Sequence, residues 1–295
     1  AEDGIRDSVA SRGLGDVYKR QVLLFALSIG LSPLSFAANP VDDDNYTYNG
    51  KRYIAKSTGG VKKGIRLSKA HKRSKKSRGS VKFIVFTQKC VRGNASDLYD
   101  DDCDRGIRRS QLEQYDELPI NRNLEYRFSV KKPYKKYPGL GGADKYYINF
   151  FEIKPFGVDA LPGKDDLPTV PTFRLNLDGK TNKFRSVISL RNHSYSDVEP
   201  LDINKDIGKL KPGWNDFKIK TKQTARKNGY VKVYHNGKLI YSYKGKTAYN
   251  DVHTYKLGLQ FWMGGYICCG QGDKLKKNEA NHIFYFDMVK ARRVK

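Results

Sequence analysis

Charged and amide side chains alternate with apolar ones in several short segments, a pattern suited to binding an anionic polymer. Arg109, Gln111 and Glu113 alternate with Ser110 and Leu112, so an extended strand would turn the three polar side chains to one face. Guanidinium, ammonium and amide groups hold acidic groups through charge and hydrogen bonds, and Trp262 adds a ring on which a sugar can stack. The same alternation turns these further polar residues away from apolar neighbours: Glu152, Lys154, Arg174, Asn176, Arg191, Lys256, Gln260 and Trp262.

These residues would act together only if their segments belong to one sheet. Its outer face would then be a basic, amide-lined, concave groove. The plain alternative is that they are the solvated outer faces that every sandwich of sheets has.

The segments themselves have the composition of strands. Short runs of aromatic and β-branched residues are separated by turn residues, and no window of similar length has a helical period. Asn236-Gly237 is the sequence of a two-residue type I′ hairpin turn. We therefore expect an all-β, antiparallel β-sandwich or jelly roll that forms one domain over residues 80–295. The expected strands are 82–88, 107–113, 124–131, 145–154, 172–178, 185–191, 214–221, 230–235, 238–243, 255–262 and 282–291.

The charge of the chain points to a polyanionic partner. Its 295 residues carry 56 Lys and Arg against 31 Asp and Glu, a formal net charge of +25. Nucleic acid, an anionic lipid surface and an acidic polysaccharide would all satisfy that charge. Hydrophobic residues make up 38% and aromatic residues 12%, enough for a packed core, which excludes a wholly disordered chain.

The first 37 residues predict export. Residues 22–34 are apolar, follow Lys19-Arg20 and precede Ser35-Phe36-Ala37, which is the pattern of a secretory signal peptide cleaved near Ala37. A buried core helix is the alternative, and Pro33 disfavours it. Residues 1–21 resemble an adapter read-through leader, which we expect to be non-native. We therefore expect a secreted or periplasmic monomer without a specific nucleic-acid partner.

Residues 51–78 carry much of the positive charge. They contain twelve Lys and Arg and no acidic residue. We expect residues 38–79 to form a flexible basic arm, which adheres to an anionic cell surface or is simply a solvated charge run.

Two stretches resemble the heparin-lyase-I-like polysaccharide lyases. Arg109-Ser110-Gln111-Leu112 resembles the R-S/A-E-L strand of that family. A later series resembles its W-x-x-F, V-x-V-x-x-NG-K and K-x-G-[IL]-Y motifs: Trp214 to Phe217, Val231 to Lys238, and Lys256 to Gln260. The resemblance covers roughly residues 82–290. It implies a β-jelly roll that cleaves anionic, uronate-containing polysaccharides by β-elimination, without a cofactor.

The family's chemistry assigns roles to individual residues. A uronate loses its C5 proton only when its carboxylate is neutralised, and a base and an acid must then move protons. The resemblance makes Arg109 and Gln111 neutralising or substrate-binding groups, and it puts Lys154 and Lys256 in the active site. Glu152, Arg174, Asn176, Arg191, Gln260 and Trp262 would bind substrate.

The correspondence breaks at two positions. Gln260 stands where the family has its catalytic Tyr, and Glu152 stands where it has a Gln. A Gln cannot act as a general base or acid. Either another residue takes that role, or the protein binds acidic glycans without cutting them, or it is a basic surface-interaction protein. The candidates for the missing role are Tyr266, His193, His253 and Lys154.

Cysteine and aspartate clusters complete the candidates. Cys90 and Cys103 are spaced for a disulfide in an oxidising compartment, and Cys268-Cys269 leave the pairing open. An acidic stretch would suit a structural Ca²⁺, or it is an ordinary surface loop. Its members are Asp97, Asp100, Asp101, Asp102 and Asp104.

Overall fold

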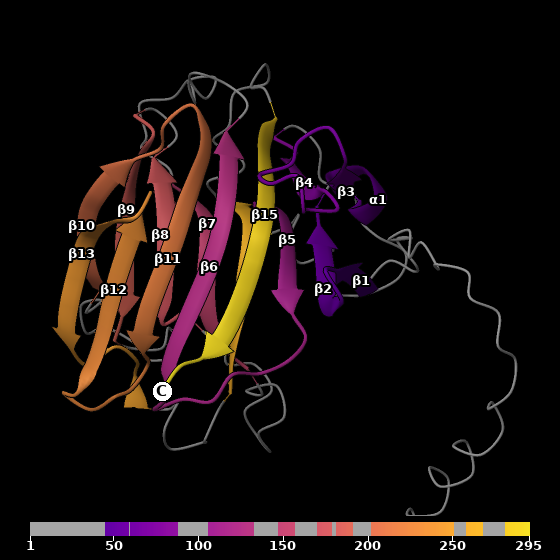
Figure 1. Cartoon of the computed structure of the whole chain (residues 1–295). Coiled ribbons are helices and arrows are strands. Elements are labelled where there is room, and N and C mark those ends of the chain that lie inside the picture. The colour runs from indigo at the N-terminus through magenta and orange to yellow at the C-terminus, as the bar shows by residue number, and fades with distance from the viewer. Residues whose placement is uncertain are drawn as a thin grey trace, which may run out of the picture. The chain divides into compact units, whose positions relative to one another are not determined.

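The computed structural model describes residues 45–58, 60–87, 106–132, 147–156, 170–178, 181–190, 202–250, 258–267 and 281–295. Within them, two antiparallel sheets form a β-sandwich of the jelly-roll type, which confirms the expected fold class (Figure 1). In the eight-stranded sheet the order is β1 (Asn45–Tyr48), β2 (Lys51–Ser57), β5 (Arg108–Gln114), β14 (Gly258–Ile267), β7 (Tyr147–Phe156), β8 (Phe173–Asp178), β9 (Lys183–Ser189) and β10 (Asp202–Lys209). In the seven-stranded sheet it is β13 (Lys238–Gly245), β12 (Gly229–His235), β11 (Gly213–Lys222), β6 (Asn123–Lys132), β15 (His282–Arg293), β4 (Ser80–Val85) and β3 (Ile65–Ser68).

Alternation predicts most strands from residue 80 onward, but not β10, whose residues are half-buried or exposed throughout. Each expected segment overlaps an observed strand. Asn236 and Gly237 have φ angles of 48° and 83°, which both central residues of a type I′ turn require. A short helix, α1 (Val61–Gly64), precedes β3, and the described residues contain no helix long and apolar enough to cross a membrane.

Aromatic side chains join the two sheets. Phe151 on β7 stacks on Phe128 of β6 with ring centres 4.8 Å apart, and Phe128 also stacks on Phe217 of β11 at 5.2 Å. Offset aromatic pairs add about 0.5–1.5 kcal/mol each to the area that they bury. This packing holds the core side of β7 in place. The side chains on the outer side of β7 therefore project from a rigid strand.

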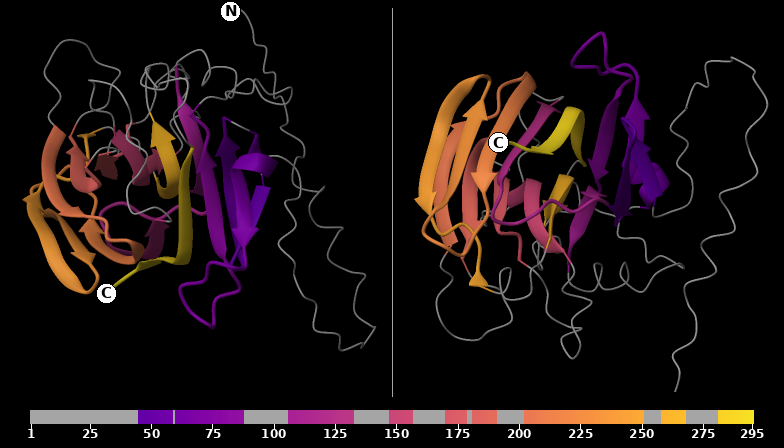
Figure 2. Two further views of the ribbon diagram at one scale, coloured as in Figure 1. Left: turned by 90° about the horizontal axis from the view of Figure 1, so that it is seen from above. Right: turned by 60° about the horizontal axis from the view of Figure 1, so that its bottom comes forward.

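The expectation of a flexible basic arm is wrong for the described part of residues 45–79. β2 pairs with β5, and β3 pairs with β4, so the segment contributes strands to both sheets (Figure 2). Tyr53 and Ala55 are buried, while Lys51 and Arg52 are exposed. The cations point outward along ordinary strands, so a high charge did not prevent folding.

A buried carboxylate ties the same segment to the core. Asp287 on β15 has no solvent exposure and accepts hydrogen bonds from Tyr48 Oη at 3.0 Å and Ser77 Oγ at 2.8 Å. The backbone N–H groups of Arg73 and Met288 also donate to it, at 2.8 and 2.7 Å. Residues 71–79 are therefore held against β15. Residues 1–44 lie outside the described part, so the signal peptide stays a prediction.

Candidate active site

Polar residues from four strands lie together on the outer face of the eight-stranded sheet. β14 is central, because it pairs with β5 on one side and with β7 on the other. Trp262 lies opposite Glu113 of β5 and Glu152 of β7, and directly opposed side chains point to the same face. We call this surface the polar face. It comprises Arg109, Gln111, Glu113, Asn149, Glu152, Lys154, Arg174, Asn176, Gln260, Trp262 and Tyr266.

Tyr266 occupies a second cross-strand row of the polar face. It lies opposite Arg109 of β5 and Asn149 of β7. The guanidinium carbon of Arg109 is 6.0 Å from the centre of the Tyr266 ring, which is within the range of a cation–π contact. The phenol thus lies between a cation and an amide.

The structure brings most of the expected site residues together. The expected members of the polar face that it describes are Arg109, Gln111, Glu152, Lys154, Arg174, Asn176, Gln260, Trp262 and Tyr266. The others lie outside the described residues, and their roles stay predictions: Arg191, His193, His253 and Lys256. The four cysteines and the Asp97–Asp104 stretch are outside as well. Among the described residues no group of three or more His, Cys, Asp or Glu side chains is placed to hold a metal ion.

Two β-bulges shape the centre of the polar face. The register shifts between Met263 and Tyr266 on β14, and between Asn149 and Phe151 on β7. Gly264 lies in the first bulge with φ 129°, and a Cβ there would be 2.2 Å from the carbonyl oxygen of Ser110. Only glycine fits, and bulges of this kind re-aim neighbouring side chains.

Because Gly264 has no side chain, side chains of β5 and β7 can meet above β14. Gln111 on β5 donates from Nε2 to Glu152 Oε2 on β7 at 3.4 Å, and Asn149 Nδ2 donates to Glu152 Oε1 at 2.5 Å. Burial raises the pKa of the Glu152 carboxyl, although these hydrogen bonds and the nearby cations Lys154 and Arg174 act in the opposite direction. The carboxyl is therefore held in a fixed position by two hydrogen bonds, in surroundings that raise its pKa.

Lys154 has an ammonium group that releases its proton more easily than an ordinary lysine. Burial lowers its pKa, and the charges of Lys56 and Arg109 lower it further. The carboxylates of Glu113 and Glu152 act in the opposite direction. A lysine whose pKa is lowered in this way supplies a neutral amine, which can act as a general base.

Trp262 does not offer the open sugar-stacking surface that the sequence suggested. Its side chain is 7% exposed. Lys154 Nζ lies 4.2 Å from the centre of its ring and Lys56 Nζ lies 5.1 Å away. Lys56 also pairs with Glu113 Oε1 at 2.7 Å. The indole therefore positions two ammonium groups by cation–π contact.

The polar face is shielded, unlike a solvated outer face. Gln111 is 1% and Gln260 3% exposed, whereas Arg127 and Lys232, on the outer face of the other sheet, are exposed. Buried polar atoms without a partner cost about 1–3 kcal/mol each. Within the part of the chain that the structure describes, six such atoms lie here without a hydrogen bond: Gln111 Oε1, Glu113 Oε1, Arg174 Nε, Asn176 Oδ1, Gln260 Nε2 and Trp262 Nε1. Of these, Glu113 Oε1 is paired with the Lys56 ammonium group. The polar side chains here are therefore largely buried, which a merely solvated face does not explain.

One end of the polar face is closed by ion pairs. Arg174 donates to Asp202 Oδ2 at 2.8 Å, and Arg185 lies 3.4 Å from Asp206 Oδ1. Arg185 also contacts the ring and hydroxyl of Tyr147. The charge of Arg174 is thus largely satisfied within the chain, which makes it a weaker ligand for an anion than the sequence suggested.

Two residues of this region escaped the sequence reasoning. The high charge of residues 51–78 predicts that Lys56 lies in a basic arm. Its neighbours Tyr53, Ala55 and Ser57 are nevertheless buried at every second position, as in a strand. Asn149 shares a face with Glu152 because the bulge adds one residue between them, and strict alternation places the two on opposite faces.

Comparison with known proteins gives the family. The sequence profile of a family described as polysaccharide lyase matches residues 47–290. A search of curated proteins finds no match. The fold is that of an endo-β-1,4-glucuronan lyase from the fungus Trichoderma reesei, with TM-score 0.60, 13% identity, and coverage of 85% of this chain and 94% of that one. An alginate lyase from Pseudomonas aeruginosa is also similar, with TM-score 0.46, 14% identity and coverage of 81% and 91%.

The family match spans most of the chain, and the sandwich agrees with it in fold. The chain is therefore an enzyme that belongs to the polysaccharide lyase family.

Proposed function

We propose that this lyase cleaves an anionic polysaccharide built from uronic acids by β-elimination. One observation carries the proposal: the shielded polar face combines groups that can neutralise a carboxylate with a lysine whose pKa is lowered. The shared fold with a glucuronan lyase supports the same class of substrate.

β-Elimination sets three requirements on the site. A group must neutralise the carboxylate at C5, because the C5 proton becomes acidic only then. A base removes that proton while the C4–O4 bond breaks and a C4–C5 double bond forms. An acid gives a proton to the departing O4. The products are a new chain end carrying the hydroxyl and an unsaturated uronate.

The polar face contains a group for each requirement. We assign neutralisation of the carboxylate to Arg109 and Gln111 on β5. Lys154 in its neutral form takes the C5 proton, and Tyr266 gives the proton to O4. Gln260 has no proton to exchange and binds through its amide.

Incubation of the protein with uronate polymers tests this function. We expect the ultraviolet absorbance of an unsaturated uronate to rise with glucuronan or alginate, and not with a neutral polysaccharide. Heparin belongs in the series, because the finer resemblance to heparin-lyase-I-like enzymes is still a proposal. Retained binding without an absorbance rise on any of these polymers would contradict the assignment.

A Glu152→Gln variant tests the electrostatic link between Glu152 and Lys154. The Glu152 carboxylate raises the pKa of Lys154, so a neutral amide of the same shape lets that pKa fall further. We expect the acid limb of the kcat/KM profile to move to lower pH. The matched control is Asp206→Asn, which makes the same kind of change on the edge strand β10, away from Lys154. It should leave the acid limb of the pH profile unchanged. A shift to higher pH would refute the link.

A further inference from the structure

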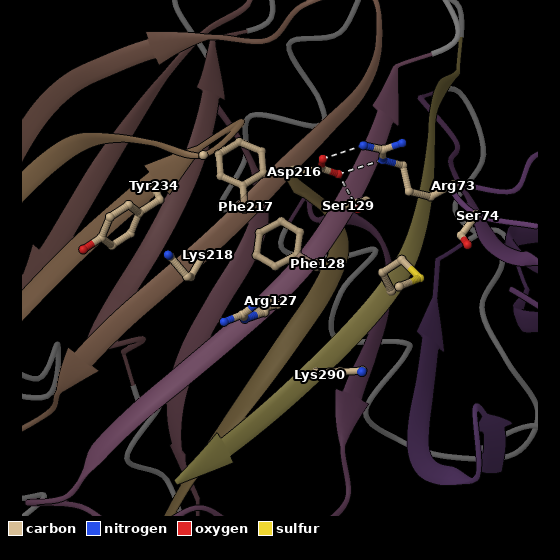
Figure 3. A pocket seen from close by; sticks show the side chains of 12 residues that line it. Arg73, Ser74, Arg127, Phe128, Ser129, Asp216, Phe217, Lys218, Tyr234 and Lys290 are labelled. Atoms are coloured by element: carbon tan, nitrogen blue, oxygen red, sulfur yellow. Dashed lines mark hydrogen bonds and ion pairs between the residues drawn. The ribbon is translucent and has the colours of Figure 1, made fainter. Parts of the chain in front are cut away.

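A hollow lies on the outer face of the seven-stranded sheet. It has a volume of 560 Å³ and is formed by β6, β11, β12 and β15 together with Arg73 and Ser74 (Figure 3). None of its lining residues belongs to the polar face. It is therefore separate from the candidate active site.

A row of cations crosses this hollow from strand to strand. Lys218 on β11 lies opposite Arg127 of β6 and Tyr234 of β12, and Arg127 lies opposite Lys290 of β15. Neighbouring strands are about 4.8 Å apart, so the row places one cation on each of three successive strands at that spacing. Like charges directly opposite one another destabilise a sheet. Glu125 offsets the central cation, since its Oε1 lies 2.8 Å from Arg127 Nε. A polyanion would relieve the repulsion that remains at Lys218 and Lys290.

The acidic groups of the region are already engaged. Asp216 is the single carboxylate among the residues that line the hollow, and Arg73 binds it through Nε at 2.9 Å and Nη2 at 2.7 Å. Within the described chain, no carboxylate lies within ion-pair distance of Lys218 or Lys290. Lys218 Nζ instead lies 4.0 Å from the centre of the Tyr234 ring. Two ammonium groups thus face the hollow with their charge uncompensated by an acid.

We propose that this hollow binds a segment of an anionic polysaccharide chain at a site distinct from the polar face. The inference rests on the proposed function, because the occupant is the uronate polymer that the enzyme cuts. A polymer with one carboxylate per sugar matches a row with one cation per strand. A hollow accommodates a single polysaccharide chain better than it accommodates the flat surface of a membrane.

A double variant, Lys218→Gln with Lys290→Gln, tests the site. Its affinity for glucuronan is measured over a salt series in a Lys154→Ala background, so that the polymer stays intact. We expect about tenfold weaker binding at low salt, because two exposed charge contacts are lost, and a shallower dependence on salt. The melting temperature should not fall, because like-charge repulsion is relieved. Lys62→Gln with Lys63→Gln on α1 removes the same charge from another exposed element and is the matched control.

The outcomes separate this inference from the proposed function. Equal loss of affinity in both double variants, or no loss in either, would overturn the site. Equally tight binding of duplex DNA or anionic vesicles to the hollow would overturn the choice of occupant. If the Lys218 and Lys290 variant alone loses affinity while no polymer is cleaved by the unmodified protein, the site stands and the proposed function fails. Cleavage with unchanged affinity refutes the site alone.

Discussion

Replacement of Lys154 by alanine is expected to lower kcat on the uronate polymer by about 100- to 10,000-fold, the usual effect of losing a general base. The amine lies on the polar face with Arg109 and Gln111 and is held 4.2 Å from the Trp262 ring centre. Lys154→Arg should not restore activity, because a guanidinium does not lose its proton in proteins. Initial rates of absorbance increase measure both variants. Lys205→Ala, an exposed lysine on the edge strand β10, is the control and keeps full activity.

The pH profile separates a base from a residue that merely binds or packs. Burial lowers the pKa of Lys154, so the neutral amine appears at lower pH than for a free lysine. The rate should therefore rise with pH through that lowered pKa, and this limb should disappear in Lys154→Ala. Added methylamine should recover part of the activity. A variant that raises KM with unchanged kcat would contradict the role of base and leave only a binding role.

Replacement of Asp287 by alanine is expected to lower the free energy of unfolding by about 3 kcal/mol or more, because several buried donors lose their acceptor at once. The carboxylate accepts from Tyr48 Oη, Ser77 Oγ and the backbone N–H groups of Arg73 and Met288. Urea unfolding measures the change. Asp287→Asn keeps one acceptor oxygen and should lose less.

Two controls make the Asp287 prediction specific to the docking of residues 71–79. Asp206→Ala removes an exposed surface ion pair with Arg185 and should change stability by no more than about 1 kcal/mol. Limited proteolysis should cleave residues 71–79 of the Asp287 variant faster than those of the unmodified protein. Unchanged stability together with unchanged cleavage would show that the segment does not depend on the carboxylate.

The sequence predicted the strands well where a single period governs the chain. In β8 the apolar residues Phe173, Leu175 and Leu177 are fully buried, and Arg174 between them faces outward, as alternation requires. This works because the pleat is a local property that depends only on neighbouring residues. The same rule assigned Gln111, Lys154 and Gln260 to non-core faces.

Alternation fails where a bulge or a strong charge masks it. Asn149 changes face because an extra residue enters β7, and no residue type marks that insertion in advance. Lys56 was missed because twelve cations in residues 51–78 suggested a solvated arm. Strand formation there depends on pairing with β5, which is distant in the sequence.

By itself the sequence determined which side chains most strands turn away from the core, and therefore most of the residues that were eligible for a common site. Only the tertiary structure decided that β5, β14, β7 and β8 are neighbours, and that Glu152 is buried and Lys154 half-buried there. Strand order is set by contacts between distant segments, and desolvation is set by everything that packs nearby. Neither the strand order nor the desolvation can be read from a local sequence period. The shifted pKa values of Glu152 and Lys154, on which the proposed chemistry depends, arise from both.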